Sequence, residues 1–220
     1  QERVVASFAS DVARFKYFKE TTRLNNSDES RILQEIASGY ESVMKLQQKD
    51  FSFEKFYYGN DDHTSITLTA HVAKTLIMEM SYTKVNRSTE IKSILDFIAS
   101  KQRSDGSFVE PLSFDFNQLG FTSFIATVLL QSLEFLTQFI PNTIAALNYI
   151  QAYEPSSTVS SNFSSFIIAT YALQLGVQAG FVNQSTFQKF YDHFFNHSMF
   201  IGVNTEALLI FTENNLARAV

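Results

Sequence analysis

The chain contains no cysteine among its 220 residues. Disulfides, zinc sites built from thiolates and catalytic thiols are therefore excluded within these residues, because each needs a cysteine sulfur. Tryptophan is also absent, and glycine (7) and proline (3) are few, whereas phenylalanine occurs 23 times. Few helix-breaking residues and many large apolar side chains favour a helical fold with a phenylalanine-rich core.

Neither strong positive charge nor a long apolar run is present. Lysine and arginine number 17 against 22 acidic residues, for a net charge of -5. This balance argues against nucleic acid and anionic membranes as partners. No uncharged apolar stretch reaches about 18 residues, so no membrane insertion is expected. No signal-peptide pattern opens the chain at Gln1, and we expect residues 1–220 to be one domain and a fragment of a larger protein.

Apolar residues recur at three- and four-residue steps, which is the spacing of one buried helix face. The clearest cases are residues 64–82, with Ile66 and Ala70, and residues 88–102, with Ile91 and Ile94. No segment shows the sustained alternation of a strand, so the predicted fold class is all-α. Helices are expected over residues 3–20, 29–48, 64–82, 88–102, 119–136, 142–153, 160–177, 183–195 and 203–216.

A short pattern, Gln-x-x-Asp-x-Ser-Phe, occurs twice without a gap. Its first copy consists of Gln47, Asp50, Ser52 and Phe53, and its second of Gln102, Asp105, Ser107 and Phe108. We also align Thr64-Ser65 with Thr122-Ser123-Phe124 and with Ser164-Ser165-Phe166. Helix pairs that repeat about every 55 residues are typical of an α/α toroid of helical hairpins. An ordinary helical array is the alternative.

Three segments in order resemble the thioester domain of the α2-macroglobulin and complement superfamily. They are GYESVMKLQQKDFSF (39–53), TSITLTAHVAKTL (64–76) and ILDFIASKQRSDGSF (94–108), with Phe97 where the family usually has tryptophan. The resemblance covers residues 2–130 and fades afterwards. It implies a secreted, extracellular α/α toroid. The chain has fewer predicted helices than that closed ring, so either the closing helices lie outside the chain or the ring is incomplete.

The resemblance also suggests where the family's chemistry would lie. In the family, the cysteine and glutamine of a Gly-Cys-Gly-Glu-Gln motif before the first helix form a reactive thioester. Alignment of the first helix places Gln1 on the second glycine, Glu2 on the glutamate and Arg3 on the glutamine. A guanidinium cannot form a thioester, so this alignment implies a degenerate site. An alternative alignment needs a two-residue insertion in the helix and places Gln1 on the motif glutamine. That alignment would imply an active domain that attaches covalently to target surfaces.

In the family, a second position determines which nucleophile receives the acyl group of the thioester. Histidine at this position favours transfer to hydroxyl groups, whereas asparagine allows direct transfer to amines. Asn117 falls at that position, and without a thioester we expect it to be a loop residue. The resemblance therefore implies a non-enzymatic domain without a cofactor, acting as a binding or structural module in innate immunity or epithelial junctions. The implied partners are other domains of the parent protein and a cell-surface or pathogen-surface protein.

Two histidine-containing patterns are candidates for other sites. Asp61-Asp62-His63 could serve an α/α-toroid enzyme as a metal or acid–base site. Capping of the following helix by Asp62 or Thr64 is the simpler account. His193 and His197 have the spacing of a zinc pair and lack an evident third ligand, so no metal site is expected. His71 lies in an apolar helix, and we expect a core or interface histidine.

Five Asn-x-Ser sequons are consistent with a secreted glycoprotein surface. Asn25 and Asn86 lie in predicted helix connections and are the favoured sites for modification. The candidates are Asn25, Asn86, Asn162, Asn183 and Asn196.

Overall fold

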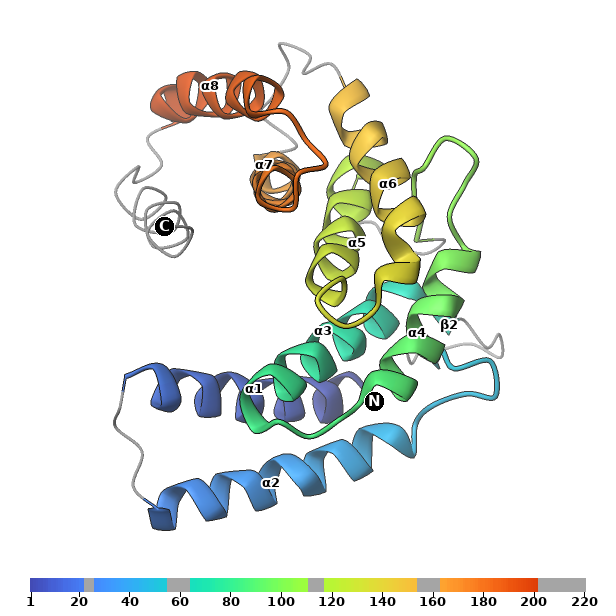
Figure 1. Ribbon diagram of the computed structural model, residues 1–220, viewed down its shortest axis with the longest axis vertical. Coiled ribbons are helices and arrows are strands. Elements are labelled where there is room, and N and C mark those ends of the chain that lie inside the picture. Colours follow the sequence, from blue (N-terminus) through green and yellow to red (C-terminus); the bar gives the residue numbers. More distant parts are fainter. Residues whose placement is uncertain (22–25, 55–63, 111–116, 154–162, 202–220) are drawn as a thin grey trace. The chain divides into compact units, whose positions relative to one another are not determined.

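The structure is a computed structural model, and it describes residues 1–21, 26–54, 64–110, 117–153 and 163–201, without the side chains at 26, 163–164 and 193–201 (Figure 1). Within these residues the regular elements are helices, apart from two strands of two residues each. The predicted all-α class is therefore confirmed. The chain divides into two compact units, Gln1–Gln102 with Gln131–Ile140 and Arg103–Leu130 with Pro141–Val220.

Four α-helices build the first unit. They are α1 (Glu2–Glu20), α2 (Asn26–Met44), α3 (Ile66–Thr83) and α4 (Ser88–Ser100). Helix α1 packs against both α2 and α3, and α3 also packs against α4 (Figure 1). The predicted ranges overlap these helices, and the largest difference is at the end of α2, which is Met44 instead of near Gln48.

The apolar spacing of α1 explains its packing. Val5, Phe8, Val12 and Phe15 are buried and lie on one face. Each such side chain contributes about 1.5–3 kcal/mol when it is removed from water. The spacing of residues 3–20 predicts a face with Val4, Phe8, Val12 and Phe15. Val5 is buried instead of the half-buried Val4, so the inward face lies about one position away from the predicted one at this end.

A two-stranded antiparallel ladder fixes the start of α3. Strand β1 (Phe53–Glu54) pairs with β2 (Thr64–Ser65), with Phe53 opposite Ser65. Thr64 and Ser65 were expected to be helical, and α3 instead begins at Ile66. The cause is that the backbone of these two residues pairs with β1.

The two Asp-x-Ser-Phe turns have the same hydrogen bonds, which confirms the predicted repeat. The Oδ1 atom of Asp50 accepts from the backbone N–H (3.1 Å) and hydroxyl (2.6 Å) of Ser52. In the second turn, Asp105 Oδ1 accepts from the N–H (2.9 Å) and hydroxyl (2.7 Å) of Ser107. Both serines are fully buried.

A buried threonine connects each turn to the next helix. The Phe53 N–H donates to Thr69 Oγ1 at 3.0 Å, and the Phe108 N–H donates to Thr122 Oγ1, also at 3.0 Å. Thr69 is therefore the counterpart of Thr122. The predicted alignment of Thr64 with Thr122 was wrong, because Thr64 belongs to the β2 strand that precedes the first of these helices.

Helices of the second unit follow the predicted order. They are α5 (Gln118–Ser132, whose last two residues belong to the first unit), α6 (Ile140–Ala152), α7 (Phe163–Gln178) and α8 (Gln184–Ile201). Helix α5 ends at Ser132, short of the predicted end at residue 136, and a 3-10 turn, η1 (Thr137–Phe139), follows. The predicted helix at 203–216 lies outside the described residues.

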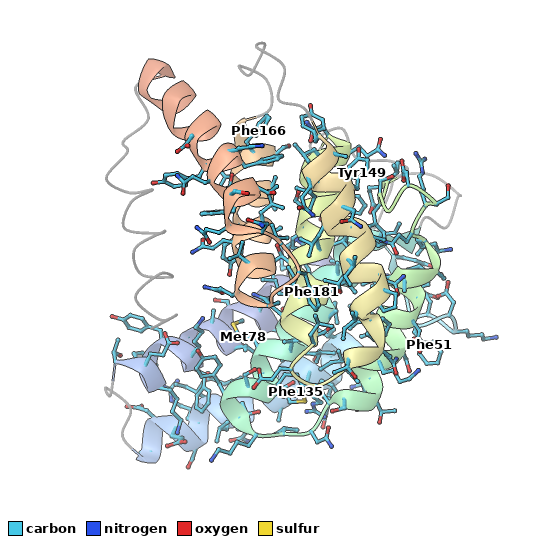
Figure 2. The ribbon with its side chains drawn as sticks, turned by 45° about the horizontal axis from the view of Figure 1, so that its top comes forward. Phe51, Met78, Phe135, Tyr149, Phe166 and Phe181 are labelled. Carbon is cyan, nitrogen blue, oxygen red and sulfur yellow. The ribbon has the colours of Figure 1, made fainter. Side chains whose placement is uncertain are left out.

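Aromatic side chains form much of the packing around α7. Phe166 lies edge-on to Tyr153, with ring centroids 6.0 Å apart, and 6.5 Å from the ring of Phe190 in α8 (Figure 2). Gly120 lets α5 approach α7 closely, since a Cβ built there would lie 2.4 Å from Ser165 Oγ. The phenylalanine-rich core expected from composition is therefore present in this unit.

Candidate functional site

The first turn of α1 carries the residues that the sequence aligned with the thioester motif. Gln1 occupies the N-cap position, and its backbone oxygen accepts from the N–H groups of Val4 (2.9 Å) and Val5 (3.1 Å). Its side chain makes no capping bond, and Oε1 is buried without a hydrogen-bond partner in the described part of the chain. Glu2 lies in the first turn, where its negative charge suits the helix dipole.

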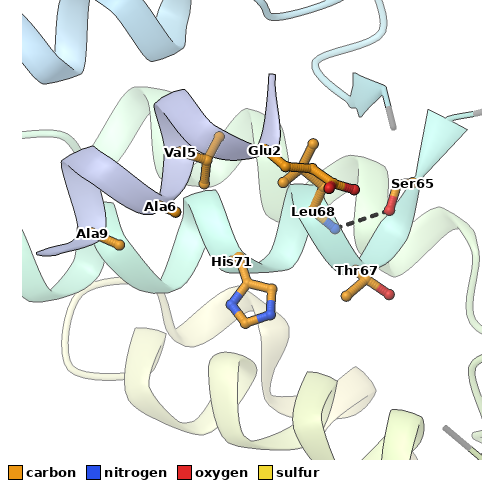
Figure 3. Close-up of a pocket in the computed structure, with 8 residues that line it drawn as sticks. All are labelled: Glu2, Val5, Ala6, Ala9, Ser65, Thr67, Leu68 and His71. Carbon is orange, nitrogen blue, oxygen red and sulfur yellow. Dashed lines mark hydrogen bonds between the residues drawn. The ribbon is translucent and has the colours of Figure 1, made fainter. Parts of the chain in front are cut away.

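The start of α3 is held by Ser65. Its Oγ atom accepts from the Leu68 N–H at 3.1 Å (Figure 3), and its backbone oxygen accepts from the Thr69 hydroxyl at 2.6 Å. The cap was predicted at Asp62 or Thr64. Thr64 does not provide it, and Asp62 lies outside the described residues, as do Asp61 and His63.

A pocket of about 280 Å³ lies between the first turns of α1 and α3 (Figure 3). We call it the α1–α3 pocket. Its walls are formed by Glu2, Val5, Ala6 and Ala9 from α1, and by Ser65, Thr67, Leu68 and His71 from the start of α3. Most of the wall is apolar, and all eight residues belong to the first unit. Arg3 is exposed and is not among these lining residues.

His71 is the least expected member of the α1–α3 pocket. It is exposed, so the prediction of a core residue was wrong, whereas the alternative of an interface residue stays a prediction. Desolvation by the surrounding protein lowers the pKa of His71 below its usual 6.5, and the positive charge of Lys74 lowers it further. The imidazole is therefore neutral at pH 7.

Asn117 has a defined structural role in the second unit. Its Oδ1 atom accepts from the Gly120 N–H at 2.9 Å, and its backbone oxygen accepts from the Phe121 N–H at 3.0 Å. It is thus the N-cap of α5, a more specific role than the predicted loop residue. The adjacent Gln118 Nε2 donates to Ser107 Oγ at 2.7 Å, which joins α5 to the second repeated turn.

Two of the predicted sequons lie in described, exposed turns. Asn86 Oδ1 accepts from the Ser88 N–H at 3.0 Å, just before α4. Asn183 Oδ1 accepts from the Ser185 N–H at 2.9 Å, just before α8. Asn196 is within α8, but its side chain is outside the description, as are those of His193 and His197. Asn25 and Asn162 lie outside the described residues.

Residues 1–194 match the protein family described as "A-macroglobulin TED domain". The chain belongs to this family. The resemblance found in residues 2–130 is confirmed, and the family match extends well past it. Because a TED domain is an α/α toroid, the predicted fold is confirmed as well.

Among curated relatives of this TED domain are two alleles, S3 and S1, of "Thioester-containing protein 1" from Anopheles gambiae. Each is 27% identical over 162 residues, which cover 70% of this chain. The match covers 11% of each relative, so the TED domain spans about a tenth of the length of the curated relatives it matches.

In the described part of the TED domain, none of the helices is long and apolar enough to cross a membrane. No cluster of three or more histidine, cysteine or acidic side chains in the same residues could hold a metal ion.

Sequence reasoning missed the pocket wall of the TED domain, although a signal was present. Glu2, Ala6 and Ala9 recur at helical spacing along α1, and Thr67 and His71 do so along α3. On each helix, these positions form a strip beside the face that carries the larger buried residues. A stripe of small and polar side chains on each of two packed helices leaves room between them.

Proposed function

We propose that this TED domain is a non-catalytic binding or structural module of a secreted macroglobulin-related protein. The observation that supports the proposal is the first turn of α1: Glu2 faces the α1–α3 pocket, while Arg3, aligned with the acyl-donor glutamine, is exposed. A thioester needs a cysteine thiol and a carboxamide that releases ammonia. Arg3 has no acyl carbon, and the 220 residues contain no cysteine.

One observation favours a second candidate function, an active thioester domain. Gln1 is the N-cap residue of α1, and its Oε1 atom is buried without a partner among the described residues. A buried carbonyl without a donor is costly and is often explained by function. If Gln1 is the motif glutamine, a cysteine preceding it in the parent chain would complete the thioester. Covalent attachment to target surfaces would then follow.

The proposed setting is extracellular. The relatives carry the name "Thioester-containing protein 1", and the exposed sequons at Asn86 and Asn183 suit a secreted glycoprotein. We propose other domains of the parent protein as one class of partner and a cell-surface or pathogen-surface protein as the other. An immune role and a role in epithelial junctions both fit such a module.

The experiment deposits the full-length parent protein on bacteria and on epithelial cell membranes, then washes each surface with strong denaturant. A non-covalent module is released completely, because denaturant disrupts folded contacts but leaves covalent bonds intact. Hydroxylamine, which cleaves esters, should then release no additional protein. Protein that withstands denaturant on either surface would show covalent attachment and favour the Gln1 candidate.

A further inference from the structure

We propose that Glu79, Arg87 and Tyr40 form an acid-sensitive clasp, which holds the end of α2 against the start of α4 and opens when Glu79 takes up a proton. We call these three residues the clasp. Tyr40 belongs to α2 and Glu79 to α3, while Arg87 immediately precedes α4. The clasp is independent of the proposed function, because none of its side chains comes from α1, where a thioester would lie.

The end of α2 depends on the clasp because the rest of the helix is held from one side. Helix α2 packs along α1, whereas α3 is the helix that packs against α4. Tyr40 lies one turn before Met44, where α2 ends. The first repeated turn follows directly. A contact at Tyr40 therefore positions both the end of α2 and the start of that turn.

Arg87 joins the other two members of the clasp. Its guanidinium carbon lies 3.4 Å from the centroid of the Tyr40 ring. Its Nε atom donates to Glu79 Oε2 at 3.3 Å, and its Nη2 atom donates to Oε1 at 3.2 Å. A planar guanidinium can stack on a ring and bind a carboxylate through two donors at once. Glu79 is therefore a positioning residue, since it fixes the orientation in which Arg87 covers Tyr40.

Burial makes this ion pair sensitive to the loss of one charge. The side chains of Glu79 and Arg87 are both largely buried. A buried cation that loses its partner is costly and moves towards water or another anion. The Glu90 carboxylate is such an anion, because it already accepts the Tyr40 hydroxyl at 3.0 Å in the first turn of α4.

Protonation turns one Glu79 oxygen from an acceptor into a donor. A protonated carboxyl has an O–H group, and every N–H group of a guanidinium is also a donor. Two donors then face each other at one of the two bonds, and that bond is lost. The guanidinium no longer has a fixed orientation, so it leaves the Tyr40 ring and the end of α2 loosens.

The surrounding groups determine the direction of the response. Burial raises the pKa of Glu79, Arg87 partly offsets the rise, and the negative charge of Glu90 adds to it. Tyr40, which faces the guanidinium from α2, stays neutral because burial raises its pKa above 10.0. A raised carboxyl pKa means that the folded protein holds this proton more tightly than the unfolded chain. Proton uptake at Glu79 therefore opens the clasp locally and does not favour unfolding of the domain.

The test measures hydrogen–deuterium exchange of the full-length parent protein at about pH 7 and at pH 4.5, corrected for the pH dependence of the chemical exchange rate. At pH 4.5, the usual pKa of a glutamate, more than half of Glu79 is protonated because its own pKa is higher. Protection of peptides from the end of α2 should fall about tenfold on acidification, whereas that of α7 should change less than about twofold.

Three variants separate clasp opening from general effects of acid. Glu79→Gln carries no charge at either pH, so the end of α2 should be weakly protected at both. Tyr40→Leu lacks the ring and should behave in the same way. Glu90→Gln is the matched control, because it removes a neighbouring carboxylate but keeps an acceptor for the Tyr40 hydroxyl. It should retain the pH response, and circular dichroism should show all three variants to be folded.

Three results would overturn the inference. The first is equal protection of the end of α2 at the two pH values. The second is a pH response in Glu79→Gln as large as that of the wild type, because another group would then be titrating. The third is a loss of protection in all helices together, which would indicate acid unfolding instead of local opening.

Discussion

At the scale of single residues, the two repeated turns differ most at their positive-φ position. Gly106 has φ +86, and a Cβ built there would lie 2.1 Å from the backbone oxygen of Ala145 in α6. Phe51 occupies the equivalent position with φ 69, and its side chain is 47% exposed. The second turn therefore needs glycine for two reasons, while the first tolerates a side chain at the cost of backbone strain.

Opposite substitutions in the two turns should have opposite effects. We expect Gly106→Ala to lower the free energy of unfolding by more than about 2 kcal/mol, because neither the backbone angle nor the Ala145 carbonyl can accommodate a Cβ. Phe51→Gly should raise it by up to about 1 kcal/mol by relieving the left-handed strain. Urea denaturation measures both, and a loss of stability in Phe51→Gly would mean that its ring makes important contacts.

Glu79 is the most deeply buried carboxylate among the described residues, at 1% exposure. Arg87 donates to its two oxygens at 3.3 and 3.2 Å. The same guanidinium lies 3.4 Å from the centroid of the Tyr40 ring, and the Tyr40 hydroxyl donates to Glu90 at 3.0 Å. Burial raises the pKa of Glu79, and the Arg87 ion pair offsets only part of that rise.

This raised pKa predicts the sign of a pH dependence. A carboxyl that is harder to ionise in the folded state contributes stability below its unfolded pKa of 4.5. That contribution is lost as the pH rises through the higher folded pKa. The unfolding free energy of the wild type minus that of Glu79→Gln should therefore fall over this window. Urea denaturation of both proteins measures the difference, and a rise with pH would show that the Arg87 pair outweighs burial.

At the scale of elements, each repeated turn is tied to its next helix through one threonine hydroxyl. Thr69 and Thr122 are both fully buried, and each accepts the N–H of the phenylalanine that ends a turn. The turn and helix therefore form one unit, in which the hydroxyl satisfies a backbone donor that water cannot reach.

Removing either hydroxyl should be costly. We expect Thr69→Val and Thr122→Val each to lower the unfolding free energy by about 1–3 kcal/mol, because a buried N–H loses its partner. Thr127→Val is the matched control, since its buried hydroxyl only donates to the Ser123 carbonyl within α5. Thermal and urea unfolding would contradict this account if the control were as damaging as the other two.

Local patterns predicted most elements but not the details that depend on pairing across the chain. The starts of α4 and α6 follow from helical spacing and from Pro141 in the first turn of α6. The two-residue strands could not be predicted, because the pairing of Phe53 with Ser65 depends on contacts beyond the local sequence. The misaligned Thr64 has the same cause, since only the fold shows that Thr69 accepts the Phe53 N–H.

The candidate site was predicted in part. The alignment of the first helix pointed to Gln1, Glu2 and Arg3. Of these, only Glu2 lines the α1–α3 pocket, and the role of all three in a degenerate motif stays a prediction. His71 was expected in the core or at an interface, because the helix around it is apolar. Burial of a helical residue depends on which face meets a neighbour, and the packing of α1 on α3 leaves His71 exposed.

At the scale of the whole molecule, the proposal of a secreted glycoprotein can be checked at two sequons. An N-glycan is attached through the amide nitrogen, so Asn86 and Asn183 can keep their Oδ1 bonds to Ser88 and Ser185 after modification. We expect both sites to be occupied when the parent protein is secreted from insect cells, as measured by peptide mass after enzymatic deglycosylation. Asn86→Gln and Asn183→Gln are the controls, and unmodified asparagine at both sites would contradict the proposal.

The parent protein is larger than this TED domain if it resembles its relatives, of which the matched region covers 11%. Its function then combines the domain with neighbours that hold it and present it to a surface. In this account the domain contributes a folded scaffold and the α1–α3 pocket, with Arg3 where the acyl donor would stand.

The most direct test of the central claim is the intact mass of the native full-length protein before and after treatment with methylamine. We expect the mass to remain unchanged, because Arg3 cannot provide a thioester carbonyl. Methylamine is small enough to reach a buried thioester, so poor access would not explain a negative result. A gain of one methylamine, mapped to the peptide containing Gln1, would contradict the account and identify an active thioester.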